Sequence, residues 1–136
     1  FDMDLAKDES DENPVFYLQY AHARLCNILK HAKSMGNKFN DNANVTPLTL
    51  ESEIHLIKNI MEFPIIVQRT HSSLEPQSIA NYLHDLAGQF HRYYAKERIV
   101  TEDVDKTAAR LILVRAIQIV IFNGLTILGI HAPERM

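Results

Sequence analysis

Apolar residues recur along most of this chain at the three- and four-residue spacing of an α-helix, and no stretch shows sustained strand alternation. Over the segment 13–35, at about 100° per residue, they fall within one arc and predict a buried helix face. Asn13 followed by Pro14 predicts the helix start, because asparagine caps free N–H groups and proline lacks one. Gly36 predicts its end. The buried arc consists of Leu18, Ala21, Leu25, Ile28, Leu29 and Ala32.

The same spacing predicts four further helices. Pro64 is expected to kink or end the second helix, and Gly124 to stop or bend the last one. The stretch 111–122 is apolar nearly all round, which is typical of a helix in the middle of a bundle. We therefore expect an all-α bundle of about five helices around a central C-terminal helix. The expected ranges are 50–62, 65–71, 77–98 and 101–123, with a further turn over 125–130 and a short tail after it.

The length of 136 residues, with 46% hydrophobic residues, suits one domain with its own core. No uninterrupted apolar run reaches the roughly 18 residues that span a membrane, because Arg115 and Gln118 interrupt the longest one. The single cysteine, Cys26, cannot form an internal disulfide, suits a reducing cytoplasm and is expected to be buried. The acidic segment 1–12 is expected to be the end of a preceding domain, which can be disordered when cut off, ahead of a helical domain over 13–136.

Charge is unevenly distributed along the chain, whose formal net charge is −3. A negative net charge argues against a general polyanion-binding protein. The segments 13–40 and 91–136 are nevertheless net positive, whereas 1–12 and 41–90 are net negative. This pattern favours attraction of phosphate to two helical stretches, although solvated helix faces produce similar patterns.

A second stripe of the first helix lies roughly 90° from the buried arc by the helical period. Its members follow one another at three- and four-residue spacing, and no acidic residue interrupts it. An unpaired nucleic-acid base needs such a mixture of side chains, with a ring for its face and donors and acceptors for its edge. The alternative is that the tyrosines pack at the edge of the bundle with their hydroxyls in water. The stripe consists of Tyr17, Tyr20, Arg24, Asn27 and His31.

The fourth predicted helix shows a similar arrangement, with a core face and a polar flank. Tyr93 and Tyr94 are adjacent, so at least one of the two rings is expected to be accessible, although Tyr94 can equally pack in the core. Arg92 and Lys96 add positive charge. The predicted core face is Ile79, Leu83, Leu86 and Phe90, and the flank is Ala87, His91, Tyr94 and Arg98.

Catalytic and metal-binding motifs are not found in the sequence. Seven histidines are present, but no two stand four residues apart as in a helical zinc site, and no Cys-x-x-Cys occurs. Gly88 stands alone, so no phosphate-cradling loop is visible. We therefore expect no catalytic residue, no metal site and no cofactor in this chain.

The two ends of the chain carry the most specific motifs. Residues 13–24 read Asn-Pro-Val-Phe-Tyr-Leu-Gln-Tyr-Ala-His-Ala-Arg, and residues 128–136 read Leu-Gly-Ile-His-Ala-Pro-Glu-Arg-Met. Both segments resemble the C-terminal, DALR-type anticodon-binding domain of arginyl-tRNA synthetases. Further markers of the resemblance are Tyr82, Leu86, Phe90, Tyr94, Ala109-Arg110-Leu111 and Asn123-Gly124.

The resemblance implies an all-helical domain that recognises tRNA within a class I enzyme of the cytoplasm. Such enzymes join arginine to its tRNA with ATP and magnesium, using motifs of an upstream catalytic domain that this sequence lacks. The implied partners are the anticodon loop of an arginine tRNA and that catalytic domain, with no membrane and no DNA. Carried over by position, the anticodon contacts are Tyr17, Tyr20, Arg24, Tyr94 and Met136.

The stripe and the resemblance agree on Tyr17, Tyr20 and Arg24, whereas only the resemblance indicates Met136. Asn27, His31, His91 and Arg98 are weaker candidates for RNA binding, and Arg98 could stack as a planar cation or contact phosphate. Two alternatives remain at this point. One is an all-helical protein-interaction module with the tyrosines as its hot spot. The other is the related domain of another class I synthetase, such as the cysteinyl enzyme, against which the C-terminal motif argues.

Overall fold

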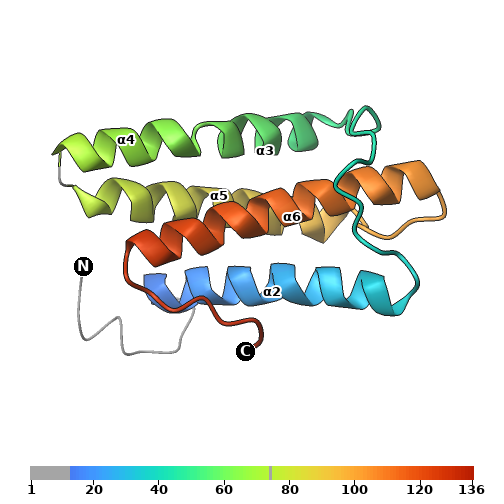
Figure 1. The fold of residues 1–136 in the computed structure, drawn as a ribbon, viewed down its shortest axis with the longest axis horizontal. Helices are drawn as coiled ribbons and strands as arrows, with labels where there is room; N and C mark the ends of the chain where they lie inside the picture. The colour runs from blue at the N-terminus through green and yellow to red at the C-terminus, as the bar shows by residue number, and fades with distance from the viewer. Residues whose placement is uncertain (1–12, 74) are drawn as a thin grey trace.

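Five α-helices build the fold in the computed structural model, which describes residues 13–73 and 75–136 (Figure 1). No strand occurs within these described ranges. The expectation of an all-α bundle of about five helices is confirmed, whereas the expectation for residues 1–12 lies outside the described residues. The helices are α2 Pro14–Ser34, α3 Glu51–Met61, α4 Phe63–Ser73, α5 Pro76–Lys96 and α6 Val104–Ile127.

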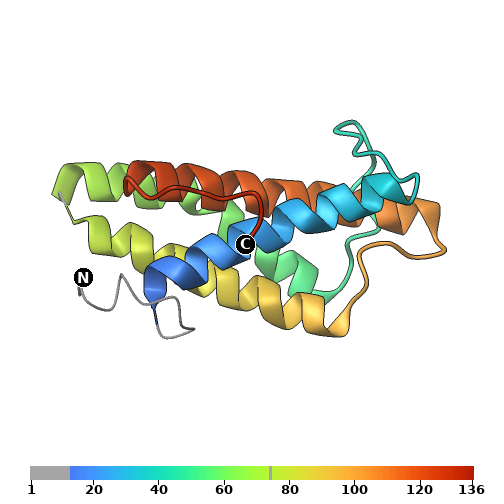
Figure 2. The same ribbon diagram turned by 90° about the horizontal axis from the view of Figure 1, so that it is seen from below.

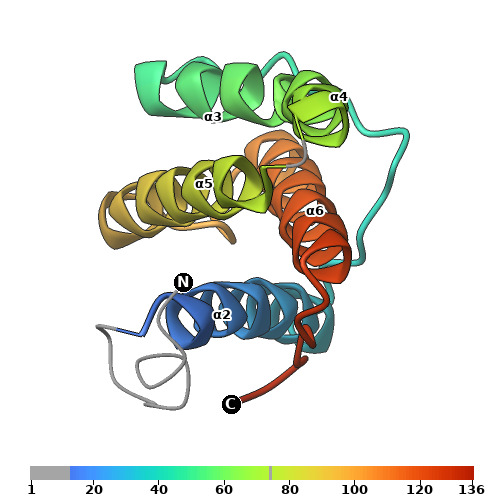
Figure 3. The ribbon, with the colours of Figure 1, turned by 90° about the vertical axis from the view of Figure 1, so that its left-hand side faces the viewer.

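The helices form three layers, which are seen end-on in Figure 3. α3 and α4 follow one another along one outer layer, α2 forms the other, and α5 and α6 lie between them. α6 packs against α2, α3 and α5, so it is the central helix that the sequence predicts. By length and composition α6 is apolar enough to cross a membrane, and half of its most apolar window is buried inside the bundle.

The predicted core faces are buried. Five of the six arc residues of α2 are buried, and Leu29 packs against the core from a half-buried position. The predicted core residues of α5 are all buried as well, and Tyr93 joins them. Tyr94, its neighbour, is half-buried, which agrees with the expectation that one of the two rings is accessible.

Local capping fixes both ends of α2. The Asn13 side chain accepts hydrogen bonds from the N–H groups of Val15 at 2.9 Å and Phe16 at 3.3 Å, as the Asn-Pro pair predicts. Gly36, at φ +87°, ends the helix in the left-handed conformation that glycine adopts without strain.

The helix break predicted at Pro64 is confirmed, because α3 ends at Met61 and α4 begins at Phe63, whereas the break predicted at Gly124 is wrong. Pro64 lies in the first turn of α4, where its missing N–H removes no hydrogen bond, so it starts this helix. Gly124 is buried inside α6, where a Cβ would lie 2.6 Å from the Leu83 side chain. The glycine therefore permits close approach of α5 and α6. α6 runs to Ile127, and Gly129, at φ +73°, reverses the chain after it.

The C-terminal tail after α6 lies along α2 in an irregular but docked conformation (Figure 2). Gln19 Nε2 donates to the carbonyl oxygen of His131 at 2.9 Å. His22, buried in α2, bonds through Nδ1 to the carbonyl oxygen of Pro133 at 2.7 Å. These contacts place the last two residues, Arg135 and Met136, beside the middle of α2 and near Tyr94 of α5.

Candidate functional site

A hollow of about 410 Å³ lies where α2, α5 and the C-terminal tail meet. We call it the base hollow. It brings together five residues that the sequence analysis singled out, although they come from three separate segments of the chain. Its lining is Tyr20, Ala23, Arg24, Asn27, Ile28, Tyr94, Arg135 and Met136.

Arg24 is held in this hollow by two neighbours on α5. Its guanidinium carbon lies 4.6 Å from the centre of the Tyr94 ring, and its Nη1 donates to Nδ1 of His91 at 2.9 Å. No carboxylate forms an ion pair with Arg24 in the described part of the chain. The guanidinium is thus oriented but not neutralised, and it can attract an anion or donate to the edge of a base.

His91 supports Arg24 as a neutral ring. Its Nδ1 accepts from a guanidinium that can only donate, so the proton of the ring lies on Nε2. Burial, reinforced by the Arg24 charge, lowers the pKa of His91 to about 4. His91 lines none of the hollows described here, so it acts beneath the surface that a ligand would touch.

The rings and the thioether around Arg24 present accessible faces. Tyr20 is 44% exposed and Met136 is 58% exposed. The Tyr94 ring stacks on the buried Phe90 ring at 5.8 Å with an interplanar angle of 9°, which fixes its orientation. A planar ligand in the base hollow would therefore meet rigid aromatic surface, a thioether that fits irregular gaps, and the donors of Arg24.

His31 and Arg98 lie in an adjoining hollow of about 570 Å³. Asn27 and Tyr94 line both hollows, so the two are continuous along α2. Arg98 and His31 are exposed, and their donors would meet a ligand that extends from the base hollow toward the end of α5.

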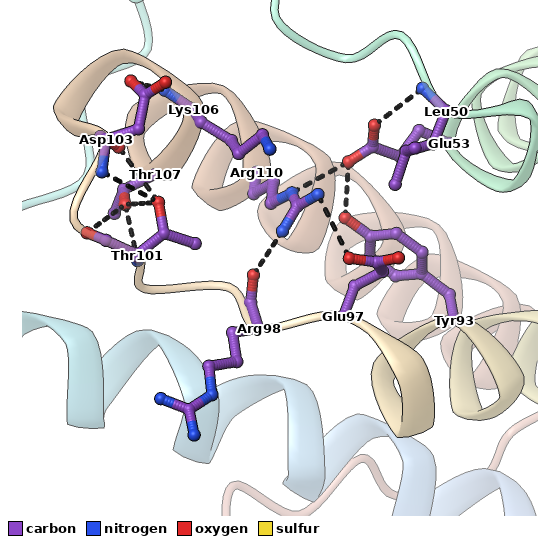
Figure 4. Close-up of polar contacts among 10 residues, drawn as sticks. All are labelled: Leu50, Glu53, Tyr93, Glu97, Arg98, Thr101, Asp103, Lys106, Thr107 and Arg110. Atoms are coloured by element: carbon purple, nitrogen blue, oxygen red, sulfur yellow. Dashed lines mark hydrogen bonds and ion pairs between the residues drawn. The ribbon is translucent and has the colours of Figure 1, made fainter.

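A buried polar cluster positions the loop that carries Arg98 (Figure 4). Arg110 Nη1 donates to the carbonyl oxygen of Arg98 at 2.6 Å, and Arg110 Nε pairs with Glu53 Oε2 at 2.9 Å. The Tyr93 hydroxyl donates to the same carboxylate oxygen at 2.6 Å, and burial raises the pKa of that phenol. The backbone of Arg98 is thereby anchored, while its side chain extends toward α2.

Tyr17 lies apart from the base hollow. Its half-buried ring packs against the core, 4.7 Å from the His84 ring and 5.5 Å from the His91 ring. Burial raises the pKa of its hydroxyl. The structure thus brings together Tyr20, Arg24, Tyr94 and Met136, but places Tyr17 beside this group, where its role in RNA contact stays a prediction.

Three residues of this region were not among the predicted site residues, although all three lie in the two motifs at the ends of the chain. Arg135 lines the base hollow, and Gln19 and His22 hold the tail that brings it there. The two end motifs could have pointed to them, whereas periodicity could not, since a contact between α2 and the chain end leaves no periodic pattern. Cys26 was expected to be buried but is half-exposed, and its Sγ accepts a hydrogen bond from Gln118 Nε2 at 3.0 Å.

The described residues contain no group of three or more His, Cys, Asp or Glu side chains that could hold a metal ion. The base hollow also has no aspartate or glutamate in its lining. Aromatic faces, a cation and an amide around such a hollow suit the binding of an unpaired base more than covalent chemistry.

Comparison with known proteins agrees with this chemistry. A sequence model described as "DALR anticodon binding domain" matches residues 18–136. The arginine–tRNA ligases of Desulforamulus reducens and Shouchella clausii are 44% and 47% identical to the chain over its whole length. The chain spans 25% of the length of each of these relatives.

Solved structures share the fold. The arginyl-tRNA synthetase of Thermus thermophilus matches 94% of this chain with 22% of its own, at 31% identity and a TM-score of 0.80. A Campylobacter jejuni structure matches the whole chain with 29% of its own at a TM-score of 0.81, and its 24% identity bears on the fold alone.

Proposed function

The chain belongs to the DALR anticodon-binding domain family, and from this premise we propose that it reads the anticodon loop of an arginine tRNA. The protein of which it is a part would then have arginine–tRNA ligase activity, as its relatives of four-fold greater length do by name. The two alternatives from the sequence, a protein-interaction module and the domain of another synthetase, are not favoured by these comparisons.

The observation that carries the proposal is the base hollow itself. Tyr20 and Tyr94 offer ring faces for stacking, and Arg24 supplies donors in a hollow that no aspartate or glutamate lines. Met136 closes the hollow from the docked tail. An anticodon loop presents splayed bases, and specific RNA recognition mostly targets such bases.

Catalysis would take place outside this chain. The upstream part of the parent protein would bind ATP with magnesium and attach arginine, while this domain holds the tRNA. A cytoplasmic location follows from this role in translation. The same argument leaves no catalytic residue and no cofactor to assign here.

Binding of purified chain to two transcripts tests the proposal. An arginine tRNA should bind more tightly than a tRNA whose anticodon lacks a middle cytosine, at one fixed salt concentration, because arginine anticodons share that base. The purified chain should not aminoacylate either transcript. Equal affinity for the two tRNAs would contradict the proposal, and so would aminoacylation by the chain alone.

A further inference from the structure

A third hollow lies between α2, α6 and the tail, and Asn27 lines it as well as the base hollow. With a volume of about 690 Å³ it is larger than the base hollow. We call it the basic hollow, because four cationic side chains line it beside a single carboxylate. Its lining is Cys26, Asn27, Leu29, Lys30, Lys33, Phe39, Arg115, Gln118, Glu134 and Arg135.

The charges of the basic hollow are not neutralised within the described part of the chain. None of Lys30, Lys33, Arg115 and Arg135 forms an ion pair there, with Glu134 or with any other carboxylate. Three of these cations come from two packed helices, and the fourth comes from the docked tail. Four cations beside one carboxylate give the hollow a net positive charge, which favours an anionic ligand.

Arg115 is held in place by a short hydrogen-bond chain. Its Nη1 donates to Gln118 Oε1, and Gln118 Nε2 donates to Cys26 Sγ at 3.0 Å. These two hydrogen bonds link Arg115 on α6 to Cys26 on α2 across the floor of the hollow. Burial raises the pKa of the Cys26 thiol, so this floor stays uncharged near neutral pH.

We propose that the basic hollow holds backbone phosphates of the RNA strand next to the nucleotide that occupies the base hollow. Asn27 and Arg135 line both hollows, so a strand can pass from one to the other without leaving the surface. A basic groove beside an aromatic platform is the arrangement by which proteins hold single-stranded nucleic acid. This inference rests on the proposed function.

The test compares two double variants of equal charge change. Lys30→Gln with Lys33→Gln removes two cations of the basic hollow, and both positions are exposed on α2. Lys58→Gln with Arg69→Gln, exposed on α3 and α4 in the opposite layer, is the matched control. Affinity for an arginine tRNA transcript is measured over a series of salt concentrations, after circular dichroism has shown that each variant is folded.

The first pair should weaken binding and reduce the slope of log K against log salt by about 1.4, at roughly 0.7 for each single-strand phosphate contact. The control pair should leave the slope unchanged. The preference for the natural middle base over a substituted one should be unchanged in both, because phosphate contacts carry no sequence information.

An unchanged slope in the Lys30 and Lys33 variant would overturn the inference. An equal loss of affinity in the Lys58 and Arg69 control would also overturn it, because it would indicate only a general effect of net charge. Tyr20→Ala separates these outcomes from a failure of the proposed function. If this variant still weakens binding while the basic hollow has no effect, anticodon reading stands and the phosphate site is refuted.

Discussion

At the scale of single residues, the geometry around Arg24 explains how a domain of net negative charge can bind RNA. Its guanidinium is fixed by Tyr94 and His91, and no ion pair within the described ranges competes with an incoming ligand. Accessible Tyr20 and half-buried Tyr17 lie one turn apart on the same helix. Truncating the two tyrosines should therefore have different effects.

Tyr20→Ala is expected to weaken binding of an arginine tRNA by about 1–3 kcal/mol, the range for one stacked base. Its free energy of unfolding should change by no more than about 0.5 kcal/mol, since Tyr20 is 44% exposed and lies outside the core. Binding titration together with urea unfolding measures both quantities. A large loss of stability with unchanged binding would show that the ring serves only packing.

Tyr17→Ala is the matched comparison. The ring packs against the core, His84 and His91, so its removal should lower the free energy of unfolding by about 1–3 kcal/mol. Urea unfolding measures this loss. Unchanged stability would contradict the packing role, and the effect on tRNA binding in the folded fraction would show whether Tyr17 also contacts RNA.

His91 should make stability depend on pH in a defined window. Its pKa in the folded state is about 4, against an ordinary value of 6.5, so the unfolded chain binds more protons between these values. Stability should therefore fall as the pH is lowered from about 6.5 to about 4, and this contribution should be lost completely below about 4. Unfolding at several pH values should show a smaller decline in His91→Gln. An identical decline of stability with pH in His91→Gln would contradict the assignment of this pH dependence to His91.

At the scale of helices, close contact between α5 and α6 depends on Gly124. Leu83 occupies the space that a side chain at this position would need. The contact holds the two central helices together, and α5 also carries Tyr94, which lines the base hollow, and His91, which holds Arg24 in place. Helix packing and site geometry are therefore connected.

Gly124→Ala should lower the free energy of unfolding by about 1–3 kcal/mol, the usual effect of overpacking a core. The introduced Cβ would lie 2.6 Å from Leu83, so one of the two helices or the leucine must shift. Thermal or urea unfolding measures the change. A stabilised variant would mean that the leucine moves away freely and that helix propensity dominates at this position.

Much of the fold could be predicted because its signals are local. Asn13 and Pro14 start α2 through their own backbone chemistry, and apolar periodicity marks the buried faces of α2 and α5. Gly124 could not be assigned in this way. The backbone preference of glycine is the same at a helix end and at a close contact between two helices. Only the position of Leu83 shows which of the two applies to Gly124.

The site was predictable to the extent that it follows one helix face. The stripe of α2 contains Tyr20, Arg24 and Asn27, which do meet in the base hollow. The contribution of the tail depends on the reversal at Gly129 and on contacts far apart in sequence, which periodicity does not contain. Tyr17 shares the stripe but not the hollow, because packing of α5 partly covers it.

Removing Met136 alone tests the contribution of the tail. The residue is exposed and follows the docked contacts of His131 and Pro133, so its loss should leave the bundle intact. Affinity for an arginine tRNA should fall, because the base hollow loses one wall. A fall in thermal stability, or unchanged affinity, would contradict this role.

At the scale of the whole molecule, the candidate RNA-binding face lies on the side of α2, opposite the outer layer of α3 and α4. The base hollow and the basic hollow both lie along α2, whose sequence carries no acidic residue. α3 and α4 form the opposite layer, and these two helices carry two acidic and two basic residues, so they have no net positive charge. A tRNA loop should therefore approach from the side of α2, α5 and the tail.

The central claim is that the base hollow reads the middle anticodon base. The most direct measurement compares an arginine tRNA transcript with the same transcript carrying one substitution of its middle cytosine, at one fixed salt concentration. We predict a loss of affinity of about 5- to 150-fold, because a mismatched base leaves hydrogen-bonding groups unpaired at about 1–3 kcal/mol. Equal affinity of the two transcripts would contradict base reading and leave this face a role in backbone docking only.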